Sequence, residues 1–330
     1  MGAPDPLLLQ MLRYKRPAFG PTEEIFIERF LLPIPGIEKD DYGNLWVSVG
    51  EDPNILWSCH TDTVHKTEGI QDLIINGPFV SANCGKKRKN SNCLGADDTT
   101  GVWLMVKMIE AQIPGLYIFH RDEEAGGKGS AFIAEYYDHQ LVGIEFAIAF
   151  DRKGYNSVIT KQHGRCCSDA FADTLIDALA PLDFKKDPTG VFTDTANYTD
   201  IIGECTNLSI GYFDQHGPKE SQNWAFANRL LEVILAADFS GLLGFRNPGE
   251  KEVYVPYQGG YRGPYQGGQD YDAMANALGY GSTVTNNFIK DLDDFVYTFP
   301  LAVTKFLEDN GFTLEDLQEH RRRRLDGWLP

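Results

Sequence analysis

Short apolar runs alternate with longer stretches of helical periodicity along the first 243 of the chain's 330 residues. The apolar runs, which Gly, Asp or Asn bound, have the length and composition of β-strands; they cover residues 36–49, 54–59, 116–119, 146–150 and 207–211. The helical patterns cover residues 23–32, 98–111, 129–137, 169–182 and 221–243. This alternation predicts an α/β fold, a three-layer αβα sandwich around a mostly parallel mixed central sheet. In such a fold, ligands bind beyond the carboxyl ends of the strands.

The amino-acid composition changes after residue 243. Residues 244–281 include the stretch VPYQGGYRGPYQGGQDYD, whose Gly, Tyr, Gln and Pro cannot bury a core, so we expect a linker or an extended arm. Residues 282–330 resume an apolar helical pattern. They predict a C-terminal helical extension, which would pack on the main domain or join copies of the chain into a homo-oligomer. The main domain would then span residues 1–243.

Charge and composition exclude several classes of partner. A net charge of −17 disfavours nucleic acid, because phosphate binding requires a basic face. The amino-terminal apolar stretch is too short for a signal peptide, and no later run approaches the roughly 20 apolar residues of a membrane span. Six cysteines in a chain of this length suit a reducing compartment rather than a disulfide scaffold. We therefore expect a cytoplasmic protein with no membrane partner.

Side chains of the kinds that bind metals lie where predicted strands end or helices begin. After the strand ILWSC comes His60-Thr61-Asp62, in which the carboxylate can accept the second N–H of the imidazole and fix its tautomer. Asp97 and Asp98 stand at the start of a helical pattern, where either carboxylate could bind a cation. Adjacent acids at this position are also typical of a helix cap.

Three further signals follow in the same arrangement. Glu123 and Glu124 follow the strand LYIFHRD, and the glycines after them permit a tight turn in which one side chain could bind a metal and the other a water. Asp151 follows the apolar strand FAIAF, and His216 lies just past another strand. Each signal alone has a structural explanation, yet five such positions on successive strand ends favour a metal centre.

The segments that carry these residues resemble a known family. SCHTDT, LGADDTTG, RDEEAGGKGS, AFDRKG and GYFDQHGPKES, in this order, resemble the co-catalytic zinc exopeptidases: the leucyl and glutamyl aminopeptidase types, with peptidase T and zinc carboxypeptidases as relatives. The resemblance covers about residues 20–243, and the Glu-Glu-x-Gly-x-x-Gly-Ser element is its most specific part.

The resemblance implies two divalent metal ions per chain, zinc or otherwise cobalt or manganese. It places Asp97, the aspartate directly after Ala96, between both ions. The remaining ligands would be His60 and Asp151 at one ion, and Glu124 and His216 at the other. It also implies that Glu123 is the general base and that Asp62 orients His60. Candidate substrate-binding residues are Asp194, Tyr212 and His163.

One departure from the family bears on the substrate. Peptidase T and the carboxypeptidases carry a lid or dimerisation domain between the last two ligand positions, whereas Asp151 and His216 are only 65 positions apart here. A chain without that domain lacks the cationic groups by which those relatives hold a substrate carboxylate. The sequence therefore favours an aminopeptidase that hydrolyses N-terminal peptide bonds.

Other functions remain open from the sequence. The same chemistry would serve a carboxypeptidase, or an amidohydrolase acting on N-acyl amino acids. A one-zinc acyltransferase of the glutaminyl cyclase kind shares the fold but does not need all five ligands. A degenerate, non-catalytic binding protein with a peptidase fold would lack ligands or the base, and Glu123 is present.

Overall fold

The computed structural model describes residues 2–83 and 91–248. Most of the predicted arm, from residue 249 on, and the whole predicted helical extension lie outside these described residues, so both stay predictions. Within the described ranges, no helix has the length and apolar character needed to span a membrane.

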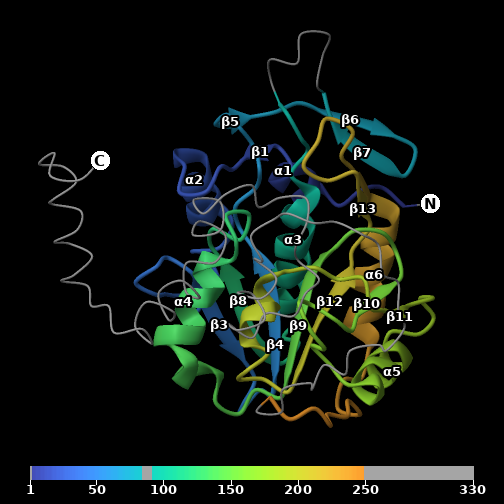
Figure 1. Cartoon of the computed structure of the whole chain (residues 1–330). Coiled ribbons are helices and arrows are strands. Elements are labelled where there is room, and N and C mark those ends of the chain that lie inside the picture. Colours follow the sequence, from blue (N-terminus) through green and yellow to red (C-terminus); the bar gives the residue numbers. More distant parts are fainter. Residues whose placement is uncertain (1, 84–90, 249–330) are drawn as a thin grey trace, which may run out of the picture. The chain divides into compact units, whose positions relative to one another are not determined.

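An eight-stranded mixed sheet forms the centre of the fold, in the order β11-β10-β12-β9-β4-β8-β3-β2 (Figure 1). Its strands are β2 (Glu38–Lys39), β3 (Leu45–Val49), β4 (Ile55–His60), β8 (Gly115–His120), β9 (Phe146–Arg152), β10 (Ser157–Ile159), β11 (Lys185–Asp187) and β12 (Glu204–Ser209). The four middle strands, β12, β9, β4 and β8, run parallel, and β3 and β10 flank them in the antiparallel sense. The carboxyl ends of the parallel strands therefore share one edge of the sheet.

The middle strands are buried along their whole apolar length because both faces of the sheet are covered. In β4, Ile55, Trp57 and Cys59 pack into one core and Leu56 packs into the other, as the alternation of side chains along a strand requires. This double burial explains why the strand appears in the sequence as a nearly continuous apolar run.

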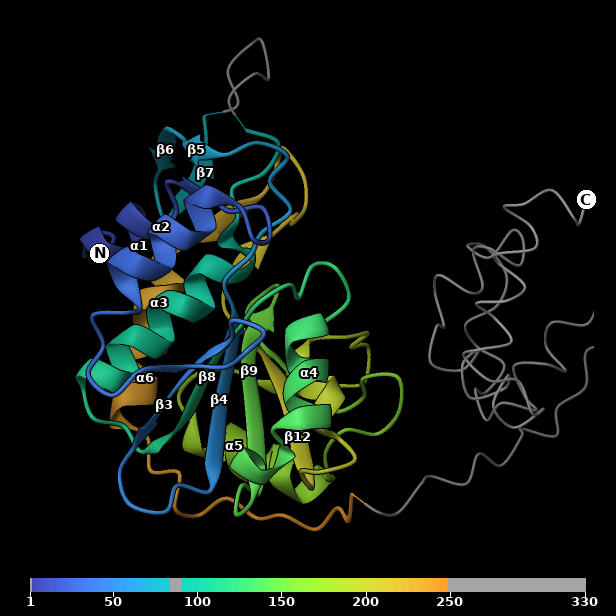
Figure 2. The same ribbon diagram turned by 90° about the vertical axis from the view of Figure 1, so that its left-hand side faces the viewer.

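Helices form the two outer layers (Figure 2). The α-helices are α1 (Pro6–Met11), α2 (Pro21–Phe30), α3 (Ala96–Glu110), α4 (Lys128–Tyr136), α5 (Asp169–Ala178) and α6 (Trp224–Ala236). Two short 3₁₀ helices are η1 (Asp138–Leu141) and η2 (Asp194–Tyr198). Helices α3 and α6 contribute to one core, whereas α4, η1 and η2 contribute to the other. The predicted three-layer αβα fold is confirmed.

Two small sheets lie outside the central one. Strands β1 (Tyr14–Lys15) and β5 (Gly69–Ile70) pair with each other. The second small sheet has four strands in the order β13-β14-β7-β6. They are β6 (Leu73–Asn76), β7 (Phe79–Ala82), β13 (Tyr212–Phe213) and β14 (Ser221–Asn223). The connection between β13 and β14 contains His216, so this sheet supports one of the predicted ligands.

The structure differs locally from two predicted elements. The run 36–49 forms two strands joined by a turn, because the Asp40 carboxylate accepts the backbone N–H groups of Gly43 and Asn44. The pattern 221–243 begins with β14 and becomes helical only at Trp224, where the Asn223 side chain caps α6 by accepting the N–H of Phe226.

Candidate metal centre

The predicted ligands meet at the carboxyl edge of the parallel strands. His60 is the last residue of β4, Asp151 lies near the end of β9, and Asp97 lies in the first turn of α3. Glu124 follows β8, and His216 follows β13. Segments that are far apart in the sequence thus bring five donor side chains to one place.

One group of donors consists of His60, Asp97 and Asp151, whose ligand atoms all lie within 4.8 Å of one another. His60 Nε2 lies 3.1 Å from Asp97 Oδ1 and 3.8 Å from Asp151 Oδ1. The His60 side chain is completely buried. This group is held by the ends of two central strands and the start of α3.

The second group consists of Asp97, Glu124 and His216, and its ligand atoms meet the same 4.8 Å limit. His216 Nε2 lies 3.1 Å from Asp97 Oδ2 and 3.1 Å from Glu124 Oε1. The His216 side chain is 50% exposed, whereas those of Asp97 and Glu124 are 8% and 11% exposed. This half of the site therefore faces solvent.

The donor set fits a pair of divalent cations. Asp97 belongs to both groups, and its two carboxylate oxygens face different histidines, as a bridging ligand requires. Two ligands on one tetrahedral Zn²⁺ at about 2.0–2.1 Å lie about 3.3 Å apart, close to the observed 3.1 Å separations. Histidine nitrogens with carboxylate oxygens are a donor set that zinc accepts.

The electrostatics of the donor side chains agree with this fit. Hydrogen bonds to Asp97 and Glu124 raise the pKa of His216 to about 11. Burial raises the pKa of Glu124 to about 7 and raises that of Glu123 well above its usual range. Because buried carboxylates that lie close together repel one another, they retain protons or share them with the histidines unless cations take the place of those protons.

Asp98, the other acid of its pair, makes different contacts. Its Oδ2 accepts the backbone N–H of His60 at 3.2 Å, and its Oδ1 accepts that of Gly101 at 3.0 Å. The carboxylate thus ties β4 to the first turn of α3. These contacts support the choice of Asp97 over Asp98 as the ligand.

Asp62 contacts His60 and the adjacent acids Glu123 and Glu124. His60 Nδ1 lies 3.1 Å from the backbone carbonyl of Asp62 and 3.4 Å from its Oδ1, and the orienting role of the carboxylate stays a prediction. The two oxygens also accept the backbone N–H groups of Glu123 and Glu124, at 3.1 and 3.2 Å. One buried carboxylate therefore contacts a donor residue from each group and the candidate base.

Replacing Asp62 by asparagine should weaken metal affinity by about 10- to 100-fold, the range found for groups that orient metal-bound histidines. The amide cannot accept hydrogen bonds on both of its arms. Zinc titration by calorimetry measures the effect. Glu204→Gln is the control, because Glu204 is a buried carboxylate at the amino end of β12, away from the site, and it accepts the backbone N–H groups of Phe245 and Arg246. Equal affinities in the wild type and the Asp62 variant would contradict this role.

Asp151 is held by groups that were not predicted to act on it. The Thr193 hydroxyl donates to its Oδ2 at 2.7 Å, and the Tyr212 hydroxyl donates to its Oδ1 at 3.1 Å. The Asn207 side chain accepts the Asp151 N–H and donates to its carbonyl. Tyr212, proposed from the sequence as a substrate contact, is 2% exposed and contacts Asp151, and its contact with substrate stays a prediction.

The other two substrate candidates lie in contrasting surroundings. Asp194 is 1% exposed and its Oδ2 lies 3.3 Å from His120 Nδ1, while burial raises its pKa to about 8. His163 is exposed, and its ring lies 5.8 Å from that of Phe192. Contact of either residue with substrate stays a prediction.

Sequence reasoning missed one buried acid of the site. Glu220 stands four positions after His216 in the segment DQHGPKES and binds the backbone of the Asp97 turn. The short spacing between His216 and Glu220 could have indicated that Glu220 lies near the site. The residue that Glu220 contacts, Asp97, is more than 120 positions away in the sequence, so the contact itself could not be predicted.

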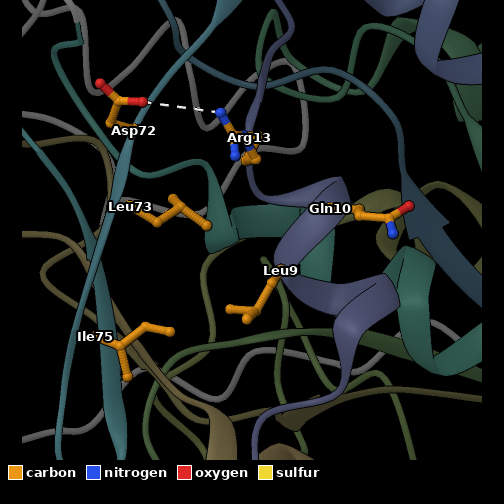
Figure 3. A pocket seen from close by; sticks show the side chains of 6 residues that line it. All are labelled: Leu9, Gln10, Arg13, Asp72, Leu73 and Ile75. Atoms are coloured by element: carbon orange, nitrogen blue, oxygen red, sulfur yellow. Dashed lines mark ion pairs between the residues drawn. The ribbon is translucent and has the colours of Figure 1, made fainter.

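A surface groove of about 470 Å³ lies elsewhere, between α1 and β6 (Figure 3). Its lining residues are Leu9, Gln10, Arg13, Asp72, Leu73 and Ile75. Arg13 and Asp72 form an ion pair of 3.8 Å across it. The groove shares no residue with the metal groups.

Solved structures resemble this arrangement of strands and helices. Aminopeptidase PepT from Bacillus cereus matches with a TM-score of 0.53 and 13% identity, over 70% of this chain and 95% of that one. An aminopeptidase from the archaeon Desulfurococcus kamchatkensis matches with a TM-score of 0.55 and 12% identity, over 70% and 92%. The fold is that of these aminopeptidases.

The TET1 peptidase of Pyrococcus horikoshii, which can assemble into a tetrahedron or a large octahedral shell, shares the fold as well. Its TM-score is 0.50 and its identity 18%, over 69% of this chain and 98% of that one. No family model matches the sequence, and no curated protein matches it.

Proposed function

We propose that this chain is a metal-dependent exopeptidase, an aminopeptidase that hydrolyses the N-terminal peptide bond with Glu123 as general base. The observation that carries the proposal is Asp97, whose two oxygens face the histidines of two adjoining ligand groups. When bound, two divalent cations polarise the scissile carbonyl and lower the pKa of a water molecule. Zinc is the ion we expect, with cobalt or manganese as alternatives.

Glu123 is suited to move the proton of the attacking water. Its Oε2 lies 4.0 Å from His60 Nε2, next to the first ligand group, and its backbone N–H is held by Asp62. Burial raises its pKa. Two adjacent cations would favour the ionised form of this carboxyl, which can then take a proton from water and deliver it to the leaving amine.

The chain between Asp151 and His216 supports an aminopeptidase over a carboxypeptidase. In the structure it forms β10, α5, β11, η2, β12 and β13, which belong to the central fold and its neighbouring small sheet. No lid domain interrupts this described interval, so this interval supplies no lid-borne cation for a substrate carboxylate. The acidic site would instead attract the ammonium group of a peptide.

A substrate panel tests the proposal. At least one aminoacyl-p-nitroanilide, with the leucyl compound as the first to test, should be hydrolysed and its N-acetylated form should not, because an aminopeptidase requires a free amine. Removal of metal with a chelator should abolish the activity, and added Zn²⁺ or Co²⁺ should restore it. Hydrolysis of N-acetyl-leucine would indicate a deacylase, and cleavage of an amino-blocked peptide with a free carboxylate would indicate a carboxypeptidase. Two bound metals with no turnover of any substrate would indicate a binding protein.

Two further predictions lie beyond this site. Self-association through residues 282–330 and a cytoplasmic location both follow from the sequence and stay predictions.

A further inference from the structure

The carboxylate of Glu220 binds four consecutive backbone N–H groups, and we call this set of contacts the clamp. Its Oε2 accepts those of Leu94 and Gly95, at 2.8 and 2.9 Å, and its Oε1 accepts those of Ala96 and Asp97, at 2.7 and 3.2 Å. Glu220 is 2% exposed and lies on the connection between β13 and β14. It is not a member of either ligand group.

The local backbone explains how four amides reach one carboxylate. Gly95 precedes α3 and has a left-handed φ of 72°, which turns the chain so that successive N–H groups point into one concavity. The first N–H groups of a helix have no partner within it, and no side chain of Gly95 can cap them. Glu220 supplies the missing acceptor from a distant segment.

This contact joins the segments that carry two ligands of one metal group. Asp97 lies at one end of the clamp, and His216 lies four positions before Glu220. His60, by contrast, is completely buried at the end of a central strand, so its position does not depend on this connection. His216 is half exposed and belongs to the short connection between β13 and β14, at whose end Glu220 binds the Asp97 turn.

We propose that Glu220 is a positioning residue that holds the Asp97 turn and the His216 loop in register, so that both side chains face the same cation. The proposal rests on the two-metal centre of the proposed function. A metal site tolerates displacements of only about 0.5 Å in its ligands. The clamp holds the segments of two ligands of the second group but of only Asp97 in the first. Loss of the clamp should therefore weaken both ions, and the ion held by Asp97, Glu124 and His216 more than the ion held by His60, Asp97 and Asp151.

A second contact should keep the loop folded when the clamp is lost. The Thr100 hydroxyl donates to Gln222 Oε1 at 2.7 Å, one turn farther along α3. The β14 strand also pairs with β7. Glu220 variants should thus retain the fold while they lose the register of the loop.

Glu220→Gln tests the proposal, because glutamine keeps the shape but directs an NH₂ group at backbone donors. In calorimetric titrations with Co²⁺, the wild type should bind two ions, and the variant should bind the second at least about tenfold more weakly. Glu204→Gln is the matched control, since it removes a buried carboxylate that accepts backbone N–H groups far from the ligands. It should bind both ions as the wild type does.

The outcomes separate this proposal from the proposed function. A wild type that binds no pair of ions would overturn both. A wild type with two ions and a Glu220→Gln variant with unchanged affinities would overturn the positioning role alone, as would equal losses in the Glu204→Gln control. If Glu220→Gln does not fold, hydrogen exchange on the metal-free wild type decides: the amides of residues 94–97 should be protected, and rapid exchange there would overturn the clamp.

Discussion

Replacing Glu123 by glutamine should lower kcat for leucyl-p-nitroanilide by about 10³-fold while both metal ions stay bound, within the range that a general base contributes. The amide cannot accept the proton of the attacking water. Glu123 is absent from both ligand groups, and its backbone N–H is held by Asp62 whether the side chain is an acid or an amide. Initial rates and metal analysis of the same sample measure the two expectations.

The neighbouring acid supplies a matched control. Glu124→Gln makes the same chemical change one position along, but Glu124 Oε1 lies 3.1 Å from His216 Nε2 within the second ligand group. We expect this variant to lose metal as well as activity. A Glu123→Gln variant that keeps most of its activity, or loses its metal as Glu124→Gln does, would show that Glu123 is not the base.

The second large effect concerns the shared ligand. Asp97→Asn should weaken both ions and reduce activity by more than about 10²-fold, because one side chain contributes to both groups and asparagine has a single carbonyl oxygen. Loss of any one of the four ligands that belong to a single group should instead weaken one ion first. Titration with Zn²⁺, followed by activity at saturating metal, distinguishes these patterns.

Asp98→Asn is the control for that variant, being the same change at the adjacent position. Asp98 accepts the N–H groups of His60 and Gly101, so its loss should destabilise the fold by about 1–3 kcal/mol. Two ions should still bind to the folded variant. The assignment of the bridging ligand would be reversed if Asp98→Asn lost both ions and Asp97→Asn retained them.

The pattern of apolar and polar residues is enough to predict the α/β fold class and the strand ends where the donor side chains meet. Runs such as 54–59 and 146–150 are recognisable because burial on both faces makes a parallel strand apolar along its length. The polar residue that ends such a strand then stands at the ligand-binding edge. His60 and Asp151 could be placed on this basis before any contact was known.

The contacts that support the site depend on tertiary packing and cannot be read from the sequence. The acids at 97 and 98 are equivalent by local pattern, and the contacts of Asp98 with His60 and Gly101 distinguish them. The clamp of Glu220 on residues 94–97 and the hydroxyl of Tyr212 on Asp151 join segments far apart in the chain. The hydrophobic periodicity of a helix or strand indicates which of its faces is buried. It does not indicate which distant segment covers that face, because the packing of the whole fold determines which segments meet.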